Sequence, residues 1–536
     1  MIPVHRLPCD EAAILHAATA TPCPARGQRW TLLAAILGSS LAFVDGTVVN
    51  VALPAIQHDL GADAAQAQWV IESYALFLAA LLLVGGALGD RYGRRRTFML
   101  GVALFAAASA ACAMAPTAPS LIAARALQGV GAALLVPGSL ALISAAFAPA
   151  QRGQAIGTWS AFSGIAAAVG PVLGGWLIDR GSWTFAFLIN VPIGLALLVI
   201  CVVRVPESRG AASAKPIDVA GALLVTVGLA GLVFGLIEGP AQGFASTPVV
   251  AALVAGPLAL LGFARIEARR AAPMLPLALF RSRNFTGTNL LTLLLYAALG
   301  GGLYFLPLNL IQVQGLGATA AGAALLPFVA IMFALSRWAG QLVDRFGPKT
   351  PLIIGPLIAA IGFALFIVPG VGADYWRTFF PAVCVLGLGM AITVAPLTTT
   401  VMNAVDPGLA GTASGVNNAV SRVGPLLAIA VFGLVMAQAF DTALTRELAA
   451  LQLPAGLRDA LEQQRGRLAG ITLPAGLDAA HAAALQRAIG EAFVAGFRRV
   501  MAACAVLALV SAASAWWLIG RERARRPARA GGERGA

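Results

Sequence analysis

The sequence consists largely of apolar segments that are each about as long as a membrane is thick. A segment has roughly 20 residues, the length that a helix needs to cross about 30 Å of hydrocarbon. Helices are expected because backbone groups in lipid must be hydrogen-bonded within the chain. Only 11% of the 536 residues are charged, against about 25% in soluble proteins. We therefore predict an all-α polytopic membrane protein, and exclude a soluble enzyme, a coiled coil and a disordered scaffold. The fourteen expected spans are approximately 31–54, 69–89, 97–115, 121–147, 154–178, 184–204, 217–238, 247–265, 285–311, 319–343, 351–369, 378–403, 411–438 and 499–519.

The basic residues indicate how these spans are oriented. An even number of spans places both termini on one side of the membrane, and the loops and tails of that side carry 24 of the 36 lysines and arginines. The short loops opposite carry only Arg180 and Arg377. Since positively charged loops stay in the cytoplasm, we predict that both termini are cytoplasmic. The net charge of +13 then reflects topology and attraction to anionic lipid, so no nucleic acid is expected as a partner.

The composition also argues against a cofactor. The six cysteines contain no Cys-x-x-Cys pair and the four histidines all lie outside the apolar segments, so neither a metal site nor a haem is expected. The only lysines, Lys215 and Lys349, follow Ala214 and Pro348, whereas a Walker A loop needs Gly-Lys followed by Ser or Thr. We expect no bound cofactor, no ATP hydrolysis at such a loop and no enzymatic activity, because the spans contain no nucleophile–base pair.

An internal repeat divides the chain. The eight residues Gly86–Gly93 (GALGDRYG) recur 254 positions later as Gly340–Gly347 (GQLVDRFG), with five of eight identical. Both copies follow a span at its cytoplasmic end, eight spans apart, which predicts two parallel six-helix halves with two inserted spans. The expected divisions are a cytoplasmic tail at 1–30, an N-terminal six-helix bundle at 31–204, the inserted pair and linker at 205–284, a C-terminal six-helix bundle at 285–519 with an outer loop at 440–498, and a cytoplasmic tail at 520–536.

Four motifs occur in order along the chain. They are Asp45-Gly46-Thr47-Val48-Val49-Asn50-Val51-Ala52-Leu53-Pro54 in the first span, Gly86-x-Leu-x-Asp90-Arg91-x-Gly93-Arg94-Arg95-Arg96 after the second, Leu121-x-x-x-Arg125-x-x-Gln128-Gly129-x-Gly131 in the fourth, and Ala166-x-x-x-Gly170-Pro171-x-x-Gly174-Gly175 in the fifth. Together they resemble the signatures of the major facilitator superfamily, and specifically its fourteen-span drug:proton antiporter-2 family of the multidrug efflux type. The resemblance extends from about Trp30 to Ile519. It implies the major facilitator fold and a bacterial cytoplasmic (inner) membrane, and it does not select a substrate.

Three charged residues within the spans are candidates for proton coupling. Asp45 is expected roughly 13 Å deep in its span, where a carboxylate faces a cavity or a partner and desolvation favours its neutral form. It is predicted to be a protonation switch, the alternative being a permanently hydrogen-bonded brace. Arg125 is predicted to restore the charge of a neighbouring acid, Asp45 or Glu72, the alternative being an arginine that extends to the outer surface. Glu72 is a departure from the family pattern, and three roles stay open: a second proton site, a counter-charge for a cationic substrate, or a side chain that reaches the outer water.

Two further motifs are expected to control the conformation. In the loop after the second span, Asp90 is expected to pair with arginines or to cap the N-terminus of a neighbouring helix. The loop is thereby expected to latch the outward-open state, the alternative being a positively charged turn with no gating role. The resemblance gives the gating candidates as Gly86, Asp90, Arg91, Gly93 and Arg94, with Asp344 and Arg345 in the repeat. In the fifth span Gly170, Pro171, Gly174 and Gly175 form the antiporter motif, with small residues for close helix packing. Ala166 stands where the family usually has glycine.

The remaining expectations concern the substrate and the partners. The candidates for lining the substrate cavity are Asn50, Tyr74, Gln128, Asn417 and Arg422. Arg422 could hold an anionic group or pair with an acid. The loop from about Phe440 to Arg498 fits two or three short amphipathic helices, which could cap the outer vestibule, meet a periplasmic adaptor protein, or lie passively at the interface.

The sequence therefore predicts a proton-coupled exporter, driven by the proton gradient, that works by alternating access. The resemblance implies amphipathic and often cationic drugs, dyes or a natural product as substrates. An uptake symporter is the alternative within transport, and it is disfavoured by the motif of the fifth span. A non-transporting membrane receptor on the same scaffold is the alternative from another class, and it is disfavoured by Asp45 and Arg125.

Overall fold

The computed structural model describes residues 25–209, 218–270, 273, 275–405, 410–451, 453–474 and 477–520, without the side chains of 25–26, 149–150, 336–337, 344, 410–411 and 455. Every regular element in these ranges is helical. Thirteen helices are long and apolar enough to cross a membrane, and a shorter apolar helix, Lys349–Leu365, brings the number to the fourteen expected spans. The predicted fold class is confirmed.

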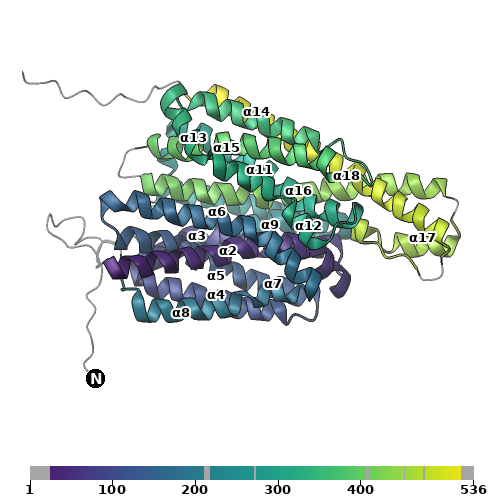
Figure 1. Ribbon diagram of the computed structural model, residues 1–536, viewed down its shortest axis with the longest axis horizontal. Coiled ribbons are helices and arrows are strands. Elements are labelled where there is room, and N and C mark those ends of the chain that lie inside the picture. Colours follow the sequence, from purple (N-terminus) through teal and green to yellow (C-terminus); the bar gives the residue numbers. More distant parts are fainter. Residues whose placement is uncertain are drawn as a thin grey trace, which may run out of the picture.

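The first half of the molecule is a bundle of antiparallel helices. They are α2 (Ala25–Leu60), α3 (Ala64–Tyr92), α4 (Arg94–Ala113), α5 (Ala118–Ala146), α6 (Pro149–Arg180) and the pair α7 (Thr184–Leu188) and α8 (Asn190–Arg204). The turns between them are short. Capping boxes fix where two of the helices begin, at Asp63 for α3 and at Thr117 for α5. Both described ends of the chain lie at one end of the bundle, here called the termini end (left in Figure 1). The opposite end, called the loop end, carries α17 (Ala455–Glu462).

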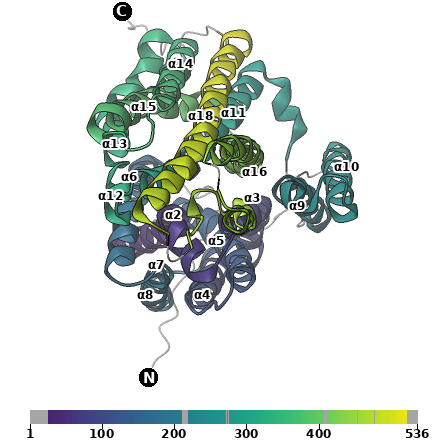
Figure 2. The same cartoon turned by 90° about the vertical axis from the view of Figure 1, so that its right-hand side faces the viewer.

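The second half is a similar bundle. It contains α11 (Arg283–Leu308) with η2 (Asn309–Val313), α12 (Ala318–Ala323) with α13 (Leu326–Phe346), α14 (Lys349–Leu365), η3 (Tyr375–Phe379) with α15 (Phe380–Asn403), α16 (Ala410–Ala450) and α18 (Ala479–Leu518). The inserted pair, α9 (Val219–Gln242) and α10 (Thr247–Arg269), lies beside the two halves (Figure 2). Only α9 packs extensively on the core of the molecule, against α3 and α16, and α10 packs mainly on α9.

The internal repeat has the same local structure in both copies. Helix α3 ends at Gly93, with φ of 114°, and α13 ends at Gly347, with φ of 73°. A side chain rarely adopts such positive φ angles, so glycine is required where the chain turns sharply into the next helix. The repeat therefore marks the same helix-to-helix turn in each half.

The outer loop is shorter than the sequence predicted. Helix α16 continues for 41 residues and α18 for 40, each about 60 Å long, so the residues expected to form a loop at 440–450 and 479–498 are helical. These stretches are rich in Ala, Leu, Arg and Gln, which propagate a helix beyond the membrane. Between them the described residues form α17 and the short turn η5 (Arg465–Gly470). The described residues from 451 to 478 are called the cap.

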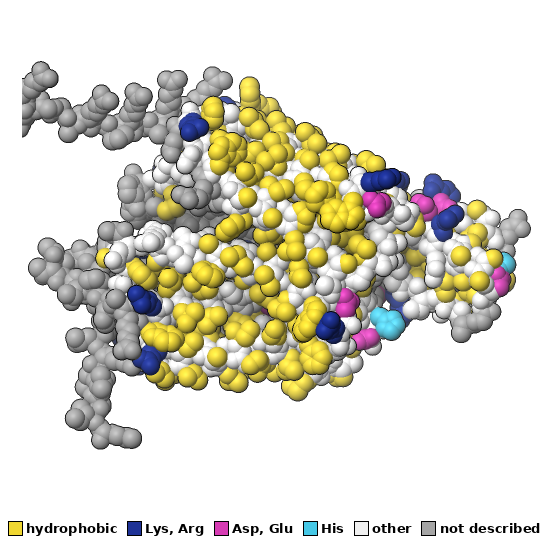
Figure 3. Space-filling view, in the orientation of Figure 1, with side chains coloured by type: hydrophobic (Ala, Val, Ile, Leu, Met, Phe, Trp, Pro, Cys, Tyr) yellow, Lys and Arg dark blue, Asp and Glu magenta, His cyan; other side chains and the backbone are white. Residues whose placement is uncertain are grey.

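The cap packs on both halves. The side chains of Leu461, Leu468 and Ile471 are buried in the main hydrophobic core, and η5 contacts α2 and α3 of the first half as well as α16 and α18 of the second. Hydrophobic side chains cover much of the visible surface between the two ends of the molecule, and the charged side chains gather toward those ends (Figure 3). That band is what a bilayer requires of the helix exteriors.

The two halves are packed together at the loop end. A Cβ atom on Gly175 of α6 would collide with the carbonyl of Ala318 in α12, and one on Gly322 would collide with the carbonyl of Pro171. The Asp179 carboxylate accepts hydrogen bonds from the backbone N–H groups of Ala318 and Thr319 at 3.1 and 2.8 Å. The outer part of α6 is therefore fixed to the second half.

The same stripe of α6 is uncovered toward the termini end. Gly153, Gly157, Gly164 and Gly175 project within about 40° of one another at 100° per residue. A Cβ atom on any of the first three would have no heavy atom of another element within 4 Å. Helices α6 and α13 thus diverge from the loop end, and the space between the halves opens at the termini end.

Candidate functional site

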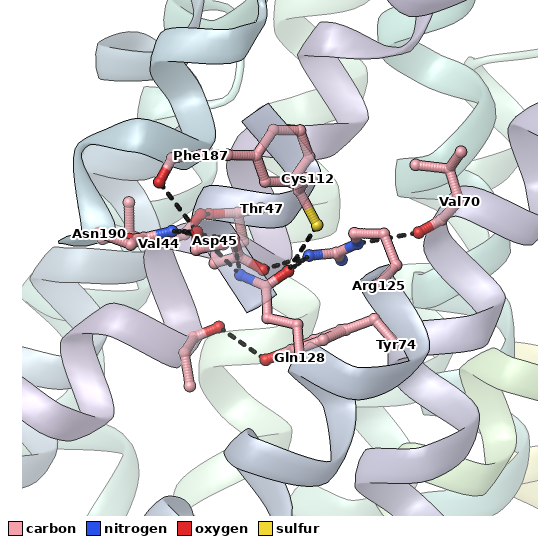
Figure 4. A network of polar contacts seen from close by, with 12 residues as sticks. Val44, Asp45, Thr47, Val70, Tyr74, Cys112, Arg125, Gln128, Phe187 and Asn190 are labelled. Atoms are coloured by element: carbon pink, nitrogen blue, oxygen red, sulfur yellow. Dashed lines mark hydrogen bonds and ion pairs between the residues drawn. The ribbon is translucent and has the colours of Figure 1, made fainter. Parts of the chain in front are cut away.

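A buried ion pair lies in the interior of the first half. The Arg125 Nη1 donates to Asp45 Oδ2 at 2.5 Å, and the two side chains are 1% and 0% exposed (Figure 4). Asp45 lies about 15 residues before the end of α2, or roughly 22 Å along its axis, because α2 continues to Leu60 rather than ending near residue 54. It is therefore deeper than the sequence indicated. The pairing of Asp45 with Arg125 is as predicted.

Two amide side chains also donate hydrogen bonds to Asp45. Gln128 Nε2 donates to Oδ1 at 2.8 Å, and Asn190 Nδ2 donates to the same oxygen at 3.1 Å. Both amides also donate to Ser109 Oγ, at 3.2 and 3.0 Å, and that hydroxyl donates to the carbonyl of Phe187 at 2.9 Å. Each donor is thus held in place by a second partner, so the carboxylate has a fixed orientation.

Arg125 is held from several sides. Its Nε donates to the carbonyl of Val70 at 3.0 Å and its Nη1 to Gln128 Oε1 at 2.6 Å. Its guanidinium lies over the ring of Tyr74, with Cζ 4.3 Å from the ring centroid. Tyr74 in turn donates to the carbonyl of Ala42 at 3.2 Å. The cation therefore joins α3 and α5 to α2.

This arrangement makes the two buried charges depend on each other. A fully buried ion pair loses about 3–5 kcal/mol when one partner is removed, because the other charge is left uncompensated. Asp45 and Arg125 therefore hold α2 and α3 to α5 only as a pair.

Two residues of this network were not predicted. Asn190 begins α8 and Ser109 lies in α4, and neither belongs to a motif or carries a charge. The one available signal is that Asn190 is an amide at the start of an otherwise apolar segment, next to Val191-Pro192. Cys112 is also buried here, and it donates weakly to Gln128 Oε1 at 3.7 Å.

The predicted cavity residues are dispersed. Gln128 and Tyr74 are buried within the ion-pair network, whereas Asn50 is half-buried one and a half turns further along α2 and takes no part in it. Asn417 donates to Asn289 and Thr292 at 3.1 and 2.8 Å, and so joins α16 to α11.

Arg422 lies on α16, which packs against α3 of the first half. The described residues contain no acid paired with it. The pairing with an acid that the sequence left open is therefore not found among them.

Glu72 lies apart from the Asp45 network. It is 0% exposed, two turns rather than one from the loop end, because α3 begins at Ala64. In this closed arrangement of the loop end its side chain therefore does not reach the outer water.

The gating motif is held within the first half. Asp90 accepts two hydrogen bonds from Arg94, at 3.0 and 2.9 Å, and Arg94 is buried. The backbone N–H groups of Arg95 and Arg96, at the start of α4, donate to Glu207 at 2.9 and 3.2 Å. Asp90 thus pairs with an arginine, one of the two roles expected for it, and Glu207 is the acid that caps the helix.

The other gating candidates have simpler surroundings. Gly86 lies against Pro137 of α5. Arg91 is exposed beside the ring of Tyr92, and Arg345 is exposed at the end of α13. The side chain of Asp344 lies outside the described residues.

The antiporter motif packs α6 on two neighbours. Cβ atoms on Gly170 and Gly174 would meet Thr47 and Val48 of α2, so these glycines bring α6 close to the helix that carries Asp45. Pro171 and Gly175 face α12 of the second half instead. One motif therefore connects the Asp45 helix to the contact between the halves.

A cavity of about 550 Å³ lies beneath the cap at the loop end. Its walls include Phe244 from the end of α9, Tyr304 from α11, Gln68 from α3, and Asp441 and Arg465. Arg465 is ion-paired with Asp441 and Glu462. Within the described residues, no group of three or more His, Cys, Asp and Glu side chains is arranged to hold a metal ion.

Comparison with known proteins identifies the family. The sequence profile described as Major Facilitator Superfamily matches residues 35–429. The chain is 36% identical over 498 residues to the tetracenomycin C resistance and export protein of Streptomyces glaucescens, with 91% of each chain covered. The chain belongs to the major facilitator superfamily.

Other relatives of this superfamily member are also resistance or export proteins. The puromycin resistance protein of Streptomyces alboniger is 38% identical, over 76% of this chain and 82% of that one. The probable actinorhodin transporter of Streptomyces coelicolor is 35% identical, over 77% and 74%. Two of these three relatives are named for export or transport, and the chain is a multi-pass membrane protein.

Solved structures agree on the fold. The bacterial homologue of the human lysosomal transporter Spinster superposes with a TM-score of 0.63 at 18% identity, covering 92% of this chain and 97% of that one. The xylose transporter XylE of E. coli gives a TM-score of 0.54 at 15% identity, covering 91% and 96%. At such low sequence identities the likeness shows a shared fold only.

Proposed function

We propose that this protein is a proton-driven exporter of amphipathic small molecules in a bacterial inner membrane. The termini end would face the cytoplasm and the loop end the exterior, as the distribution of basic residues predicts. The observation that carries the proposal is the Asp45–Arg125 pair, a single titratable contact buried in a bundle whose helices also form the contact with the other half.

The coupling would proceed through the charge of Asp45. When the loop end is open, a proton from outside neutralises the carboxylate, weakens its hold on Arg125 and displaces the substrate outward. The halves then reorient, and Arg125 restores the ionised carboxylate as the proton leaves to the cytoplasm. Each charge that crosses gains about 2.3 kcal/mol per 100 mV of membrane potential. No bound cofactor and no enzymatic step is needed.

The gating and antiporter motifs would transmit this change. Because Gly170 and Gly174 place α6 against the Asp45 helix, a shift of that helix reaches Gly175 and the contact with α12. The Asp90–Arg94 turn would stabilise the opposite state, in which the termini end closes. The cap would cover the outer exit, and its exposed surface is where a periplasmic adaptor protein would bind if one is used.

The relatives suggest the substrate class. Three of them are named for tetracenomycin C, puromycin and actinorhodin, so we propose a drug, a dye or a secreted natural product that is amphipathic and often cationic. Export is preferred to uptake because the relatives are named for resistance or export and because the motif of α6 resembles the antiporter signature. A receptor that does not transport has no need of a titratable pair that can be rearranged by one proton.

Dye export tests the proposal. Inverted vesicles are energised and the uptake of a cationic dye is measured for wild type and for Asp45→Asn, which keeps the size of the side chain but cannot titrate. We expect uptake that a protonophore abolishes in wild type and that falls at least tenfold in Asp45→Asn. Uptake by Asp45→Asn at the wild-type rate and with the same protonophore sensitivity would exclude Asp45 as the coupling group.

A further inference from the structure

Glu72 is buried without a partner. Its side chain is 0% exposed, and neither carboxylate oxygen accepts a hydrogen bond. By contrast, Asp45 at a similar degree of burial has three donors. An ionised carboxylate in such surroundings would lose its hydration with nothing to replace it, which is far more costly than burying the neutral acid. Closure around Glu72 therefore requires the protonated form.

The surroundings of Glu72 belong to both halves of the molecule. Gln68, Glu72 and Leu76 are spaced at i, i+4 and i+8 and so share one face of α3. Gln68 donates to the carbonyl of Ile429 in α16 at 3.4 Å, and Leu76 packs in a cluster with Leu426 of the same helix. Glu72 thus lies within the contact that closes the loop end.

The charged groups of the neighbouring elements do not pair with Glu72. Arg125 of α5 is paired with Asp45, and Glu238 of α9 accepts a hydrogen bond from Trp69 at 2.9 Å. Arg422 of α16 forms no hydrogen bond or ion pair with Glu72. Tyr304 of α11 is buried, and its neutral phenol cannot compensate a negative charge. The described residues provide no cation for Glu72.

We propose that Glu72 is a second proton-binding site, whose proton comes from the outer side and holds the loop end closed. The inference rests on the proposed function, because it takes the loop end to open during transport. When the halves separate there, Glu72 meets outer water and can ionise. Once ionised, it opposes closure until it takes up a proton again.

This proton differs from the one carried by Asp45. Because Glu72 is 0% exposed while the loop end is closed and the termini end is open, its proton returns to the side from which it came. The site would thus set the balance between the two conformations without adding to the number of protons transported. The sign follows from linkage: the closed state binds the extra proton, so a rise in pH favours the open state.

The test measures the distance across the loop end at different pH values. Nitroxide labels are attached to cysteines at His58, exposed at the end of α2, and Trp376, exposed in η3 of the second half. The full chain, with its native cysteines replaced, is studied in nanodiscs by pulsed EPR. We expect the ratio of closed to open molecules to fall by up to about tenfold per pH unit above the titration point.

Two variants decide the outcome. Glu72→Gln cannot ionise, so it is expected to stay closed throughout, with the distance distribution of wild type at acid pH. If this variant does not fold, Glu72→Leu makes the same comparison with an apolar side chain. Glu491→Gln, which alters an exposed acid of α18, is the matched control, and it is expected to keep the pH-dependent shift. A wild-type distance that does not change with pH, or a shift that persists in Glu72→Gln or Glu72→Leu, would overturn the proposal.

The experiment is independent of transport. It needs no substrate, so the role of Glu72 and the export function can fail separately. A protein that exports dye but shows no shift would retain the proposed function without this site. A shift without export would retain the site.

Discussion

At the residue scale, the Asp45–Arg125 pair should behave as one unit. Arg125→Leu leaves Asp45 buried without its cation, and we expect a loss of about 3–5 kcal/mol of stability. In the double variant with Asp45→Asn no charge remains, so a large part of that loss should be recovered. Thermal unfolding of the purified protein in detergent measures both. If Arg125→Leu destabilises the wild-type protein and the Asp45→Asn variant equally, the two residues are not directly coupled.

The sequence predicted this pair better than its supporting residues. Charged groups inside apolar segments are rare enough to be found by inspection, and for that reason Asp45, Glu72 and Arg125 stood out. Asn190 and Ser109 are uncharged and reach Asp45 from helices far along the chain. Their function depends on how α4 and α8 pack, which no spacing within either segment encodes.

At the scale of elements, the glycines of α6 should divide into two groups. Gly175→Ala puts a methyl group against the carbonyl of Ala318, so the contact with α12 must loosen. Gly157→Ala on the same stripe meets no other element, and alanine favours a helix by about 0.5–1 kcal/mol. We expect the distance between the labels at His58 and Trp376 to lengthen in Gly175→Ala and to stay unchanged in Gly157→Ala. Lengthening in both variants, or in neither, would show that the stripe does not govern closure.

The existence of the helices was easier to predict than their ends. Apolar length gave all fourteen spans, because a membrane imposes a minimum that the sequence must meet. The membrane sets no maximum helix length, so α16 and α18 continue into stretches of strong helix formers. The sequence analysis had interpreted these stretches as separate short helices. The prolines at 454 and 474 lie between these two helices, and Pro454 immediately precedes α17.

At the scale of the whole molecule, the repeat predicted two halves but not the end at which they touch. The closed loop end and the open termini end are one of at least two arrangements that an alternating-access protein must adopt with one sequence. Composition and motifs are identical in both, so only packing contacts such as the close backbone approaches at Gly175 and Gly322 distinguish them.

The cap provides a direct test of whether the halves must separate at the loop end. A Cβ atom on Gly466 in η5 would lie 3.8 Å from Cβ of Asp63 at the start of α3, the usual separation across a disulfide. Because η5 is joined on both sides to helices of the second half, oxidation of the pair Asp63→Cys and Gly466→Cys should fix the loop end closed. We expect export to stop on oxidation and to return when the disulfide is reduced. Each single variant is the control, since Asp63→Cys alone removes the cap of α3 at a cost of about 1 kcal/mol. Undiminished export by the oxidised protein would mean that the substrate leaves without displacement of the cap.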